Sequence, residues 1–203
     1  MLLPEITTRI AELAQTGQRV IIAVAGPAGS GKSTVAEALA DALGPTAAVV
    51  PMDGFHLDNH ILAARGLLAR KGAPETFDAN GFVTLIQRLK AQDEVVIPVF
   101  DRQRDIAIAG ARVIDASHRI LLVEGSYLLL DEQPWSQLAP LWDLTIALDV
   151  PMDVLEPRLI DRWLAHDHTA DQAKARALAN DIPNARYVIA HARPAQITVK
   201  NVG

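Results

Sequence analysis

Residues 20–42, VIIAVAGPAGSGKSTVAEALADA, constrain the fold of this chain more than any other stretch. The segment begins with a run of apolar residues, Val20–Ala25, which has the length and composition of a buried strand. A loop, GPAGSGKS, follows and matches the pattern G-x-x-x-x-G-K-[ST] at every position. Helical spacing then resumes in the apolar residues Val35, Ala38, Leu39 and Ala42. We expect a strand, a glycine-rich loop and a helix in succession.

This succession is typical of a polyphosphate site. Glycines let the loop backbone turn tightly and approach phosphate oxygens without Cβ clashes. The loop amides and the helix N-terminus would present donors and positive charge to an anion. Lys32 would reach the β- and γ-phosphates, and the Ser33 hydroxyl would bind Mg²⁺. A glycine turn that merely connects strand to helix would not need Lys and then Ser at the helix start. The sequence predicts a nucleoside triphosphate site at Gly26, Pro27, Ala28, Gly29, Ser30, Gly31, Lys32, Ser33 and Thr34.

Bulk properties exclude several other classes of protein. With 203 residues, the chain is long enough for one well-packed α/β domain and short for two. A formal net charge of −5 argues against a general nucleic-acid binder, and the absence of cysteine excludes disulfides and thiol nucleophiles. Residues 1–17 lack the features of a signal peptide, and no run approaches the ~20 apolar residues of a membrane helix. We expect a cytoplasmic protein that binds neither nucleic acid nor membrane.

Apolar runs alternate with helical patterns along the rest of the chain. Further strands are expected at residues 47–51, 119–123, 144–150 and 196–200, and helices at 4–15, 82–90, 151–165 and 182–191. Residues 95–100 also read as a strand, but Pro98 places them in a hairpin with 111–114 rather than in a sheet centre. Strands separated by helices predict an α/β fold with a central parallel sheet of about five strands and helices on both faces. Without linker or repeat, residues 1–203 are expected to form one domain.

Two carboxylates directly follow apolar strands. Asp53 comes just after the strand at 47–51, and Glu124 just after the strand at 119–123. In open parallel sheets, ligands bind at the carboxyl ends of the strands. A lone carboxylate such as Glu124 could also be a surface residue, but after a wholly apolar strand it would be costly unless a metal or donors met it. Asp53 is therefore the candidate base for an acceptor hydroxyl, and Glu124 the candidate metal ligand.

Two arginines occupy one face of the helix expected at 151–165. Arg158 and Arg162 lie four residues apart, a spacing that usually serves only solubility and capping. They could also cover the negative charge that develops during phosphoryl transfer. The segment at 167–179 that follows is polar and alanine-rich, which fits a short lid that closes over phosphates and excludes water.

Other polar residues receive structural interpretations. Arg65, Arg70 and Lys71 are interpreted as a solvated face, the usual location of such charges. His166 and His168 are interpreted as part of a polar lid or helix end, because structural metal sites need three or four ligands and no third ligand of suitable spacing follows.

Longer segments resemble a known family. The stretch DGFHLDNHILAARGLLARKGAPETFDANGFVTLIQRL at 53–89 resembles bacterial pantothenate kinase of the P-loop type. VIPVFDR at 96–102 and LLVEGSYLLL at 121–130 place the chain among the uridine kinase, phosphoribulokinase and pantothenate kinase relatives. Within that group, MDGFH, RKGAPETFD, RWLAH and NDIPNA are similar to bacterial proteins labelled fructose transport system kinase or fructokinase-like. The resemblance implies a three-layer P-loop fold with a small β-hairpin and a short lid, and ATP and Mg²⁺ as cofactors. Because relatives are often dimers or tetramers, it also implies a homo-oligomer such as a homodimer.

The resemblance also implies residue roles. It matches Asp53 to the aspartate that activates the acceptor hydroxyl, Glu124 to the glutamate after the metal-side strand, and Arg162 to the arginine of the lid helix. Phe100 and Asp101 stand where relatives place a tyrosine followed by a polar substrate-binding residue. Asn184 falls near the position of an asparagine that lines the acceptor pocket in pantothenate kinases.

Departures from the relatives bear on the acceptor. Phe77 and Phe100 stand where relatives often have tyrosine, and His56 stands where nucleoside kinases use a ring that packs on the base. His56 lies three residues from the proposed base, so we expect it to line the acceptor pocket. Arg102 and Arg104 could bind substrate or form ion pairs with neighbouring aspartates. These features suit a small polyol or sugar such as fructose. A pantothenate- or nucleoside-type kinase, or a nucleotide-binding regulator or slow ATPase, remains the alternative.

Overall fold

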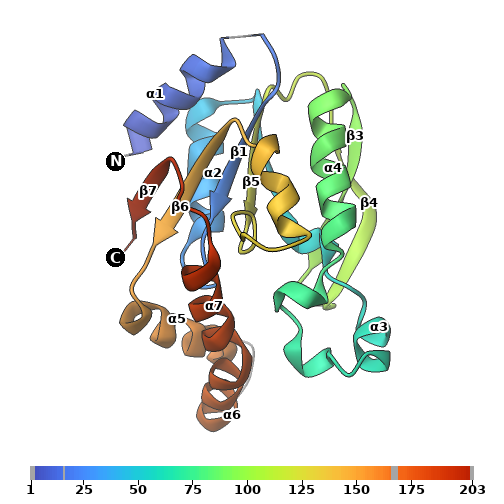
Figure 1. Cartoon of the computed structure of the whole chain (residues 1–203), viewed down its shortest axis with the longest axis vertical. Helices are drawn as coiled ribbons and strands as arrows, with labels where there is room; N and C mark the ends of the chain where they lie inside the picture. The colour runs from blue at the N-terminus through green and yellow to red at the C-terminus, as the bar shows by residue number, and fades with distance from the viewer. Residues whose placement is uncertain (1–2, 16, 166–168, 202–203) are drawn as a thin grey trace.

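A parallel five-stranded sheet forms the centre of the molecule in the computed structural model, which describes residues 3–15, 17–165 and 169–201. Its strands run in the order β2-β5-β1-β6-β7 (Figure 1). Their bounds are β1 Val20–Ala25, β2 Ala47–Pro51, β5 Ile120–Gly125, β6 Leu144–Asp149 and β7 Ile197–Lys200. All four pairings are parallel, so the carboxyl ends of the strands gather at one edge.

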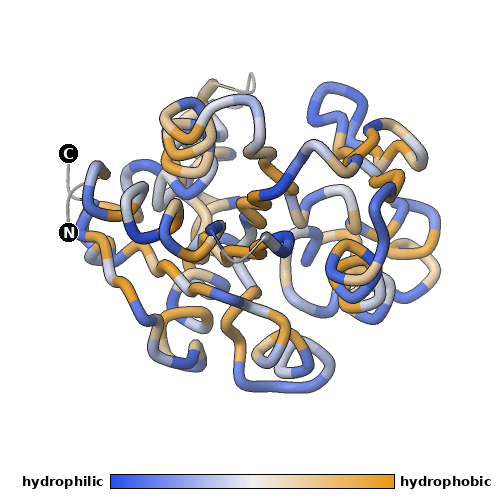
Figure 2. Tube along the Cα trace, turned by 90° about the horizontal axis from the view of Figure 1, so that it is seen from above, coloured by the Kyte–Doolittle hydropathy of each residue, from blue (hydrophilic) through white to orange (hydrophobic). Residues whose placement is uncertain are grey.

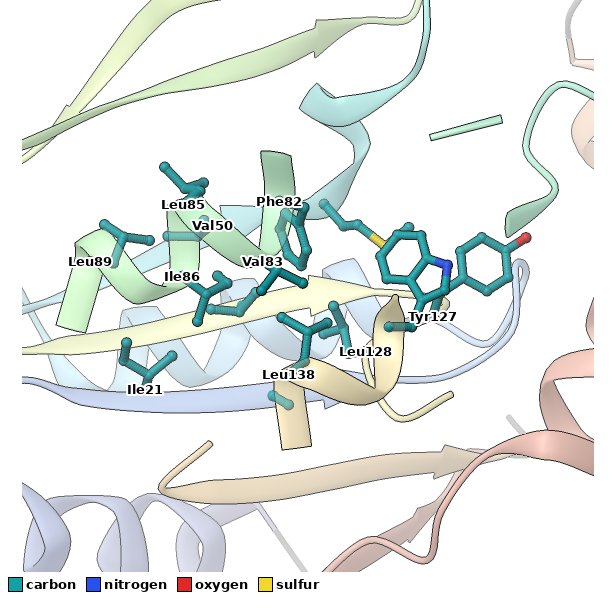
Figure 3. Packing of buried hydrophobic residues seen from close by; sticks show 14 of the residues in the cluster. Ile21, Val50, Phe82, Val83, Leu85, Ile86, Leu89, Tyr127, Leu128 and Leu138 are labelled. Atoms are coloured by element: carbon teal, nitrogen blue, oxygen red, sulfur yellow. The ribbon is translucent and has the colours of Figure 1, made fainter. Parts of the chain in front are cut away.

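Helices cover both faces of the sheet because alternate residues of β1 point to opposite faces. Val20, Ile22 and Val24 pack against α1 (Leu3–Ala14) and α2 (Lys32–Leu43). Ile21 and Ala23 belong to the cluster on the other face, with α4 (Ala79–Ala91), the 3₁₀ segment η4 (Trp135–Leu141) and part of α7 (Ile182–His191). Figure 3 shows α4 side chains packed over the strands of this cluster. In Figure 2 the outer helices carry both hydrophobic and hydrophilic residues, as amphipathic helices do.

A β-hairpin and several short segments lie beyond the edge strand β2. Strands β3 (Val95–Asp101) and β4 (Ile106–Ile114) pair antiparallel, and their register shifts between Ile97 and Val99, where Pro98 cannot donate a hydrogen bond. Between β2 and α4 the chain forms η1 (Met52–Phe55), α3 (Asn59–Ala64), η2 (Leu68–Arg70) and η3 (Pro74–Thr76).

The lid follows β6 and consists of α5 (Met152–Leu164), α6 (Ala170–Arg176) and the π-helical segment η5 (Ala177–Asp181), which continues into α7. It has a separate small core, formed by Val150, Leu155, Leu159, Ala177, Ile182 and Ala185. In Figure 1 the lid lies at the lower end of the molecule, the end to which the strands point.

The structure confirms the predicted α/β fold with its five-stranded parallel sheet and hairpin. Helix α4 begins earlier than predicted, because the Asp78 side chain accepts a hydrogen bond from Gly81 N and caps it. Strand β4 is longer than the predicted 111–114, and Glu124 lies inside β5 rather than after it. No helix within the described ranges is long and apolar enough to cross a bilayer.

Candidate active site

The phosphate loop, residues 26–33, connects β1 to α2. Gly29 and Gly31 have φ of +79° and +82°, a left-handed conformation that other residues rarely adopt. An added Cβ at Gly31 would also lie 2.6 Å from the side-chain nitrogen of Asn201. Helix α2 begins without a side-chain cap, so the amides of its first turn can serve an anion. The loop has the geometry of a phosphate site.

Glu124 lies next to this loop and is 5% exposed. Lys32 Nζ lies 4.0 Å from its Oε2, and the Ser33 side chain is close enough to favour the charged form of the carboxylate. In the part of the chain that the structure describes, Oε2 has no hydrogen-bond partner. Burial raises the pKa of Glu124, and the positive charge of Lys32 opposes this effect. A buried carboxylate oxygen beside a serine hydroxyl fits a divalent cation, which would replace the lost hydration.

A cation at Glu124 would need ligands in addition to the carboxylates and histidines of the described residues. Among the described residues, no group of three or more His, Cys, Asp or Glu side chains could hold a metal ion. Mg²⁺ typically uses one or two protein ligands together with phosphate oxygens and water. Ser33 and Glu124 therefore fit Mg²⁺ that is bound together with a nucleotide.

Sheet order places Asp53 near this metal position. Strand β2 pairs with β5, and Pro51 lies opposite Glu124 in the register. Asp53 follows two residues later, in η1. Its Oδ2 accepts a hydrogen bond of 2.6 Å from Arg102 Nη2, an ion pair that orients the carboxylate. Asp53 and Lys32 line the same cavity.

That cavity has a volume of about 400 Å³ and lies between the phosphate loop, η1, the hairpin and the lid. Of the predicted site residues, those that line it are Ala28, Lys32, Asp53, His56, Phe77, Phe100, Arg102, Arg162 and Asn184. Further lining residues that the sequence did not single out include Lys71, Asp105, Tyr127, Trp163, Arg176 and Asp181. In Figure 3, Tyr127 lies at one end of the core cluster with its hydroxyl pointing away from it.

His56 forms part of an aromatic wall of the cavity. Its ring centroid lies 4.1 Å from that of Phe77 and 4.4 Å from that of Phe100. Nδ1 lies 2.7 Å from the carbonyl oxygen of Asp53, which assigns the proton of the neutral ring to Nδ1 and leaves Nε2 as an acceptor. Burial lowers the pKa of His56, with Asp53 opposing. The ring is therefore neutral at neutral pH.

Lys71 corrects the interpretation of Arg65, Arg70 and Lys71 as a solvated face. Arg65 is exposed, but the side chain of Lys71 is only 9% exposed. Lys71 Nζ lies 2.7 Å from Asn59 Oδ1 and 2.8 Å from the Asp105 carboxylate, and 5.2 Å from the centre of the Phe100 ring. The turn-rich segment folds back over the hairpin and encloses this ammonium group.

The lid arginines occupy two different positions. Arg162 lines the cavity, and partial burial together with the charge of Arg102 lowers its pKa. Two guanidinium groups thus line one cavity, that of Arg102 from the hairpin and that of Arg162 from the lid helix. Arg158 lies outside the cavity, with Nη1 3.4 Å from the Gly29 carbonyl oxygen. The lid helix therefore contacts the phosphate loop at Arg158 and the cavity at Arg162.

Asp101 does not line the cavity, contrary to the expectation of a substrate contact. Its carboxylate accepts hydrogen bonds from the backbone and the side chain of Arg104. Successive residues of a strand point to opposite faces, so Phe100 faces the cavity while Asp101, the last residue of β3, turns away. Arg102 lines the cavity from the turn that follows. His166 and His168 lie outside the described residues.

The missed residues had a signal in the sequence. Lys71 belongs to RKGAPETFD, and Asn180 and Asp181 belong to NDIPNA, two of the segments that carried the family resemblance. The described structure packs these two segments together: Arg70 Nη2 lies 3.2 Å from Asn184 Oδ1.

Comparisons with known proteins agree with this geometry. Residues 21–189 match the model of the phosphoribulokinase/uridine kinase family. The crystal structure of a candidate fructose transport system kinase from Silicibacter sp. TM1040 has a TM-score of 0.93 and 48% identity, covering 98% of this chain and 99% of that one. A candidate uridine kinase from Schizosaccharomyces pombe is 34% identical over 200 residues, 91% of this chain and 84% of that protein. A pantothenate kinase from Streptomyces avermitilis is 34% identical over 161 residues, which are 73% of this chain and 47% of that protein.

The fold and the phosphate loop define a P-loop kinase. The chain belongs to the phosphoribulokinase/uridine kinase family, and it is an ATP-dependent kinase of small molecules.

Proposed function

We propose that this kinase phosphorylates a hydroxyl group of a small polyhydroxylated metabolite, with fructose as the first candidate, and that it uses Mg²⁺ and ATP. The observation that carries the proposal is the position of Asp53, which faces the same cavity as Lys32 and Arg162. A carboxylate in this place can take the proton of an acceptor hydroxyl while cations cover the charge on the phosphoryl oxygens.

The residues have separate roles in this reaction. Asp53 takes the proton from the acceptor hydroxyl, whose oxygen forms the new bond to the γ-phosphorus. The bond from that phosphorus to the bridging oxygen of the β-phosphate breaks, and ADP leaves. Lys32 and Arg162 stabilise the charge on the phosphoryl oxygens from the loop and the lid. Ser33 and Glu124 would hold Mg²⁺, which would neutralise phosphate charge when bound. Arg102 orients Asp53 through their ion pair.

The acceptor side of the cavity suits a small neutral molecule rich in hydroxyl groups. Nε2 of His56 can accept a hydrogen bond from a hydroxyl group. Lys71 and Arg102 already have carboxylate partners, Asp105 and Asp53, so their charges are compensated within the protein. The name of the Silicibacter protein, which is 48% identical, also supports a sugar.

The alternatives have less support. A nucleoside base would need an open aromatic face, but the His56 ring lies between Phe77 and Phe100. The match to the pantothenate kinase spans less than half of that protein. A regulator or simple ATPase would not require a carboxylate such as Asp53, oriented by Arg102, across the cavity from Lys32.

An ATP-coupled turnover screen tests the proposal, with fructose, other hexoses and pentoses, uridine, cytidine and pantothenate as acceptors. We expect Asp53→Asn to lower kcat by about 10²- to 10⁴-fold on the acceptor that turns over. Binding of the ATP analogue AMP-PNP, measured by calorimetry, should stay unchanged. Asp41→Asn, at an exposed position on α2, is the matched control and should keep the wild-type kcat. Binding of AMP-PNP without turnover of any acceptor would instead support the regulator.

A further inference from the structure

Two consecutive residues of the lid contact different walls of the active site. Asn180 and Asp181 lie in the π-helical segment η5, between α6 and α7. Such segments are rare and often occur at functional sites. Asp181 accepts a hydrogen bond from Trp163 Nε1 of α5, whereas Asn180 donates to the backbone of Lys71. Segment η5 therefore connects the lid helix α5 to the wall of the cavity that contains Lys71, Phe100 and Asp105, which we call the acceptor wall.

Both the nitrogen and the oxygen of the Asn180 side chain take part in this connection. Asn180 is 1% exposed, and its Nδ2 donates to the Lys71 carbonyl oxygen at 2.9 Å. Its Oδ1 accepts hydrogen bonds from Arg70 Nη1 and from Asn184 Nδ2, each at 3.1 Å. A shift of η5 relative to the Arg70–Lys71 turn would leave buried polar groups unpaired, which is costly. The two segments are thus held in one relative position.

The backbone of Lys71 sets the place of its ammonium group in the acceptor wall. From the main chain that Asn180 holds, the side chain reaches Asn59 and Asp105 and lies over Phe100. The next residue, Gly72, accepts a hydrogen bond from the hydroxyl of Tyr127. The turn is therefore anchored from the lid by Asn180 and from the segment after β5 by Tyr127.

At its other end, the lid helix contacts the phosphate loop directly. An added Cβ at Gly29 would lie 3.3 Å from Leu159 Cδ2, and Arg158 Nη1 is 3.4 Å from the Gly29 carbonyl oxygen. One turn further along α5, Trp163 binds Asp181 and lies 5.0 Å from the guanidinium carbon of Arg176. A continuous series of contacts runs from the phosphate loop through α5 and η5 to Lys71.

We propose that Asn180 is a positioning residue that couples nucleotide binding at the phosphate loop to the placement of Lys71 in the acceptor wall. A nucleotide that fixes α5 against the loop also fixes η5, and through Asn180 it fixes the Arg70–Lys71 turn. The coupling is reciprocal, so an ordered acceptor wall favours nucleotide binding. The proposal rests on nucleotide binding by the phosphate loop and is independent of the role of Asp53 and of the acceptor's identity.

Hydrogen–deuterium exchange with and without Mg²⁺ and AMP-PNP tests the coupling in the full chain. In the wild type, we expect the nucleotide to slow exchange both in α5 and in residues 68–76. In Asn180→Ala, the protection of α5 should persist, and that of residues 68–76 should fall to the nucleotide-free level. The quantity compared is the change in exchange rate that the nucleotide causes within each protein. A general loosening of the turn would raise exchange both with and without nucleotide and would not abolish this change. Asn80→Ala, at an exposed position in α4, should behave like the wild type.

A second variant covers the case in which Asn180→Ala does not fold. Asn180→Asp keeps an oxygen for Arg70 but removes the N–H that holds Lys71, and should also lose the nucleotide-dependent protection of residues 68–76. If the nucleotide protects only α5 in the wild type, or if residues 68–76 keep their full protection in both Asn180 variants, the coupling is wrong although the nucleotide site stands. Failure of AMP-PNP to bind would overturn the nucleotide site, and the coupling with it.

Discussion

The edge of the sheet where the strands end, next to the phosphate loop, contains an ionisable side chain in apolar surroundings. Glu124 continues an apolar strand and is 5% exposed, although a buried carboxylate is unfavourable without compensation. Ser33 and Lys32 supply only part of that compensation, since Lys32 Nζ is 4.0 Å away. A bound Mg²⁺ would supply the remaining compensation, so the effect of Mg²⁺ on the stability of a Glu124 variant tests the proposed metal site.

The first residue-scale prediction concerns Glu124→Gln. We expect this variant to bind ATP in the presence of EDTA as the wild type does, but to lose most of the additional stabilisation that Mg²⁺ provides. Mg²⁺ at about 100 times its Kd would raise the free energy of unfolding of the ATP-bound wild type by about 2.7 kcal/mol. For the variant, we expect this increase to be less than half as large. Thermal melting in ATP with EDTA and in ATP with Mg²⁺ measures the difference. Glu37→Gln, at an exposed position on α2, is the control, and equal Mg²⁺ effects in both variants would contradict the assignment.

A second prediction follows from the lowered pKa of His56. Because the unfolded chain takes up this proton at higher pH than the folded chain, the free energy of unfolding falls as the pH drops below about 6.5. The decrease continues until the pH passes the folded-state pKa. Urea denaturation between about pH 5 and pH 8 should show a smaller acid-side loss for His56→Phe than for the wild type. His60→Phe, whose side chain is 81% exposed in the wild type, should follow the wild-type curve. Identical slopes for all three proteins would refute the prediction.

At the scale of elements, the close contact between η1 and β3 sets the position of Asp53, the proposed base, relative to Arg102. An added Cβ at Gly54 would lie 2.6 Å from the Pro98 carbonyl oxygen. Gly54 follows Asp53, and Arg102 follows directly after the end of β3, so this contact brings the two charged partners together. A bulkier residue at Gly54 would separate the hairpin from the end of β2.

We therefore predict that Gly54→Ala lowers the free energy of unfolding by about 2–3 kcal/mol through overpacking, and reduces kcat because Asp53 and Arg102 move apart. Gly66→Ala gives the comparison, since Gly66 has φ of +69° but no atom within 4 Å of the added Cβ. That variant should lose only about 1 kcal/mol through backbone strain and should keep its kcat. Chemical denaturation and steady-state kinetics measure both effects. Equal losses in the two variants would exclude the steric explanation.

At the scale of the whole molecule, the end of the sheet opposite the active site is held by Arg19. Its guanidinium group donates hydrogen bonds of 2.6–2.9 Å to five carbonyl oxygens, those of Leu89, Gln92, Asp93, Asp115 and His118. These bonds join the start of β1 to the end of α4 and to the loop before β5. A planar fork of donors makes this possible, and lysine cannot reproduce it.

Arg19→Lys should accordingly lower the free energy of unfolding by about 2–3 kcal/mol, because five carbonyl groups, three of them in partly buried hydrogen bonds, lose a charged donor. The Kd for AMP-PNP should stay within about twofold of the wild type at a temperature where the protein is folded, since the change is remote from the phosphate loop. Urea denaturation and calorimetry give the two quantities. Arg88→Lys, at an exposed position on α4, should change the stability by less than about 0.5 kcal/mol. A large loss of nucleotide affinity in Arg19→Lys would show that the two ends of the sheet are coupled.

The strands and the phosphate loop could be predicted because their signals are local. Apolar runs of strand length, the position of Pro98 and the loop pattern each depend on neighbouring residues, and the structure confirms the elements they predicted. The positions of Asp53 and Glu124 followed from a general rule on strand ends. Asp101 was misplaced because the family pattern gives the residue type but not the face of the strand to which it points.

The sequence alone determined that this chain folds as a parallel α/β sheet with a phosphate loop, because residue spacing and loop chemistry act over a few neighbouring positions. Only the tertiary structure decided what surrounds that loop. The order β2-β5-β1 brings Asp53, Glu124 and Lys32 to one edge, and the lid returns Asn180 to Lys71, 109 residues earlier in the chain. Such contacts depend on how the elements pack, and the packing buries Lys71, which its sequence neighbourhood had indicated to be solvated.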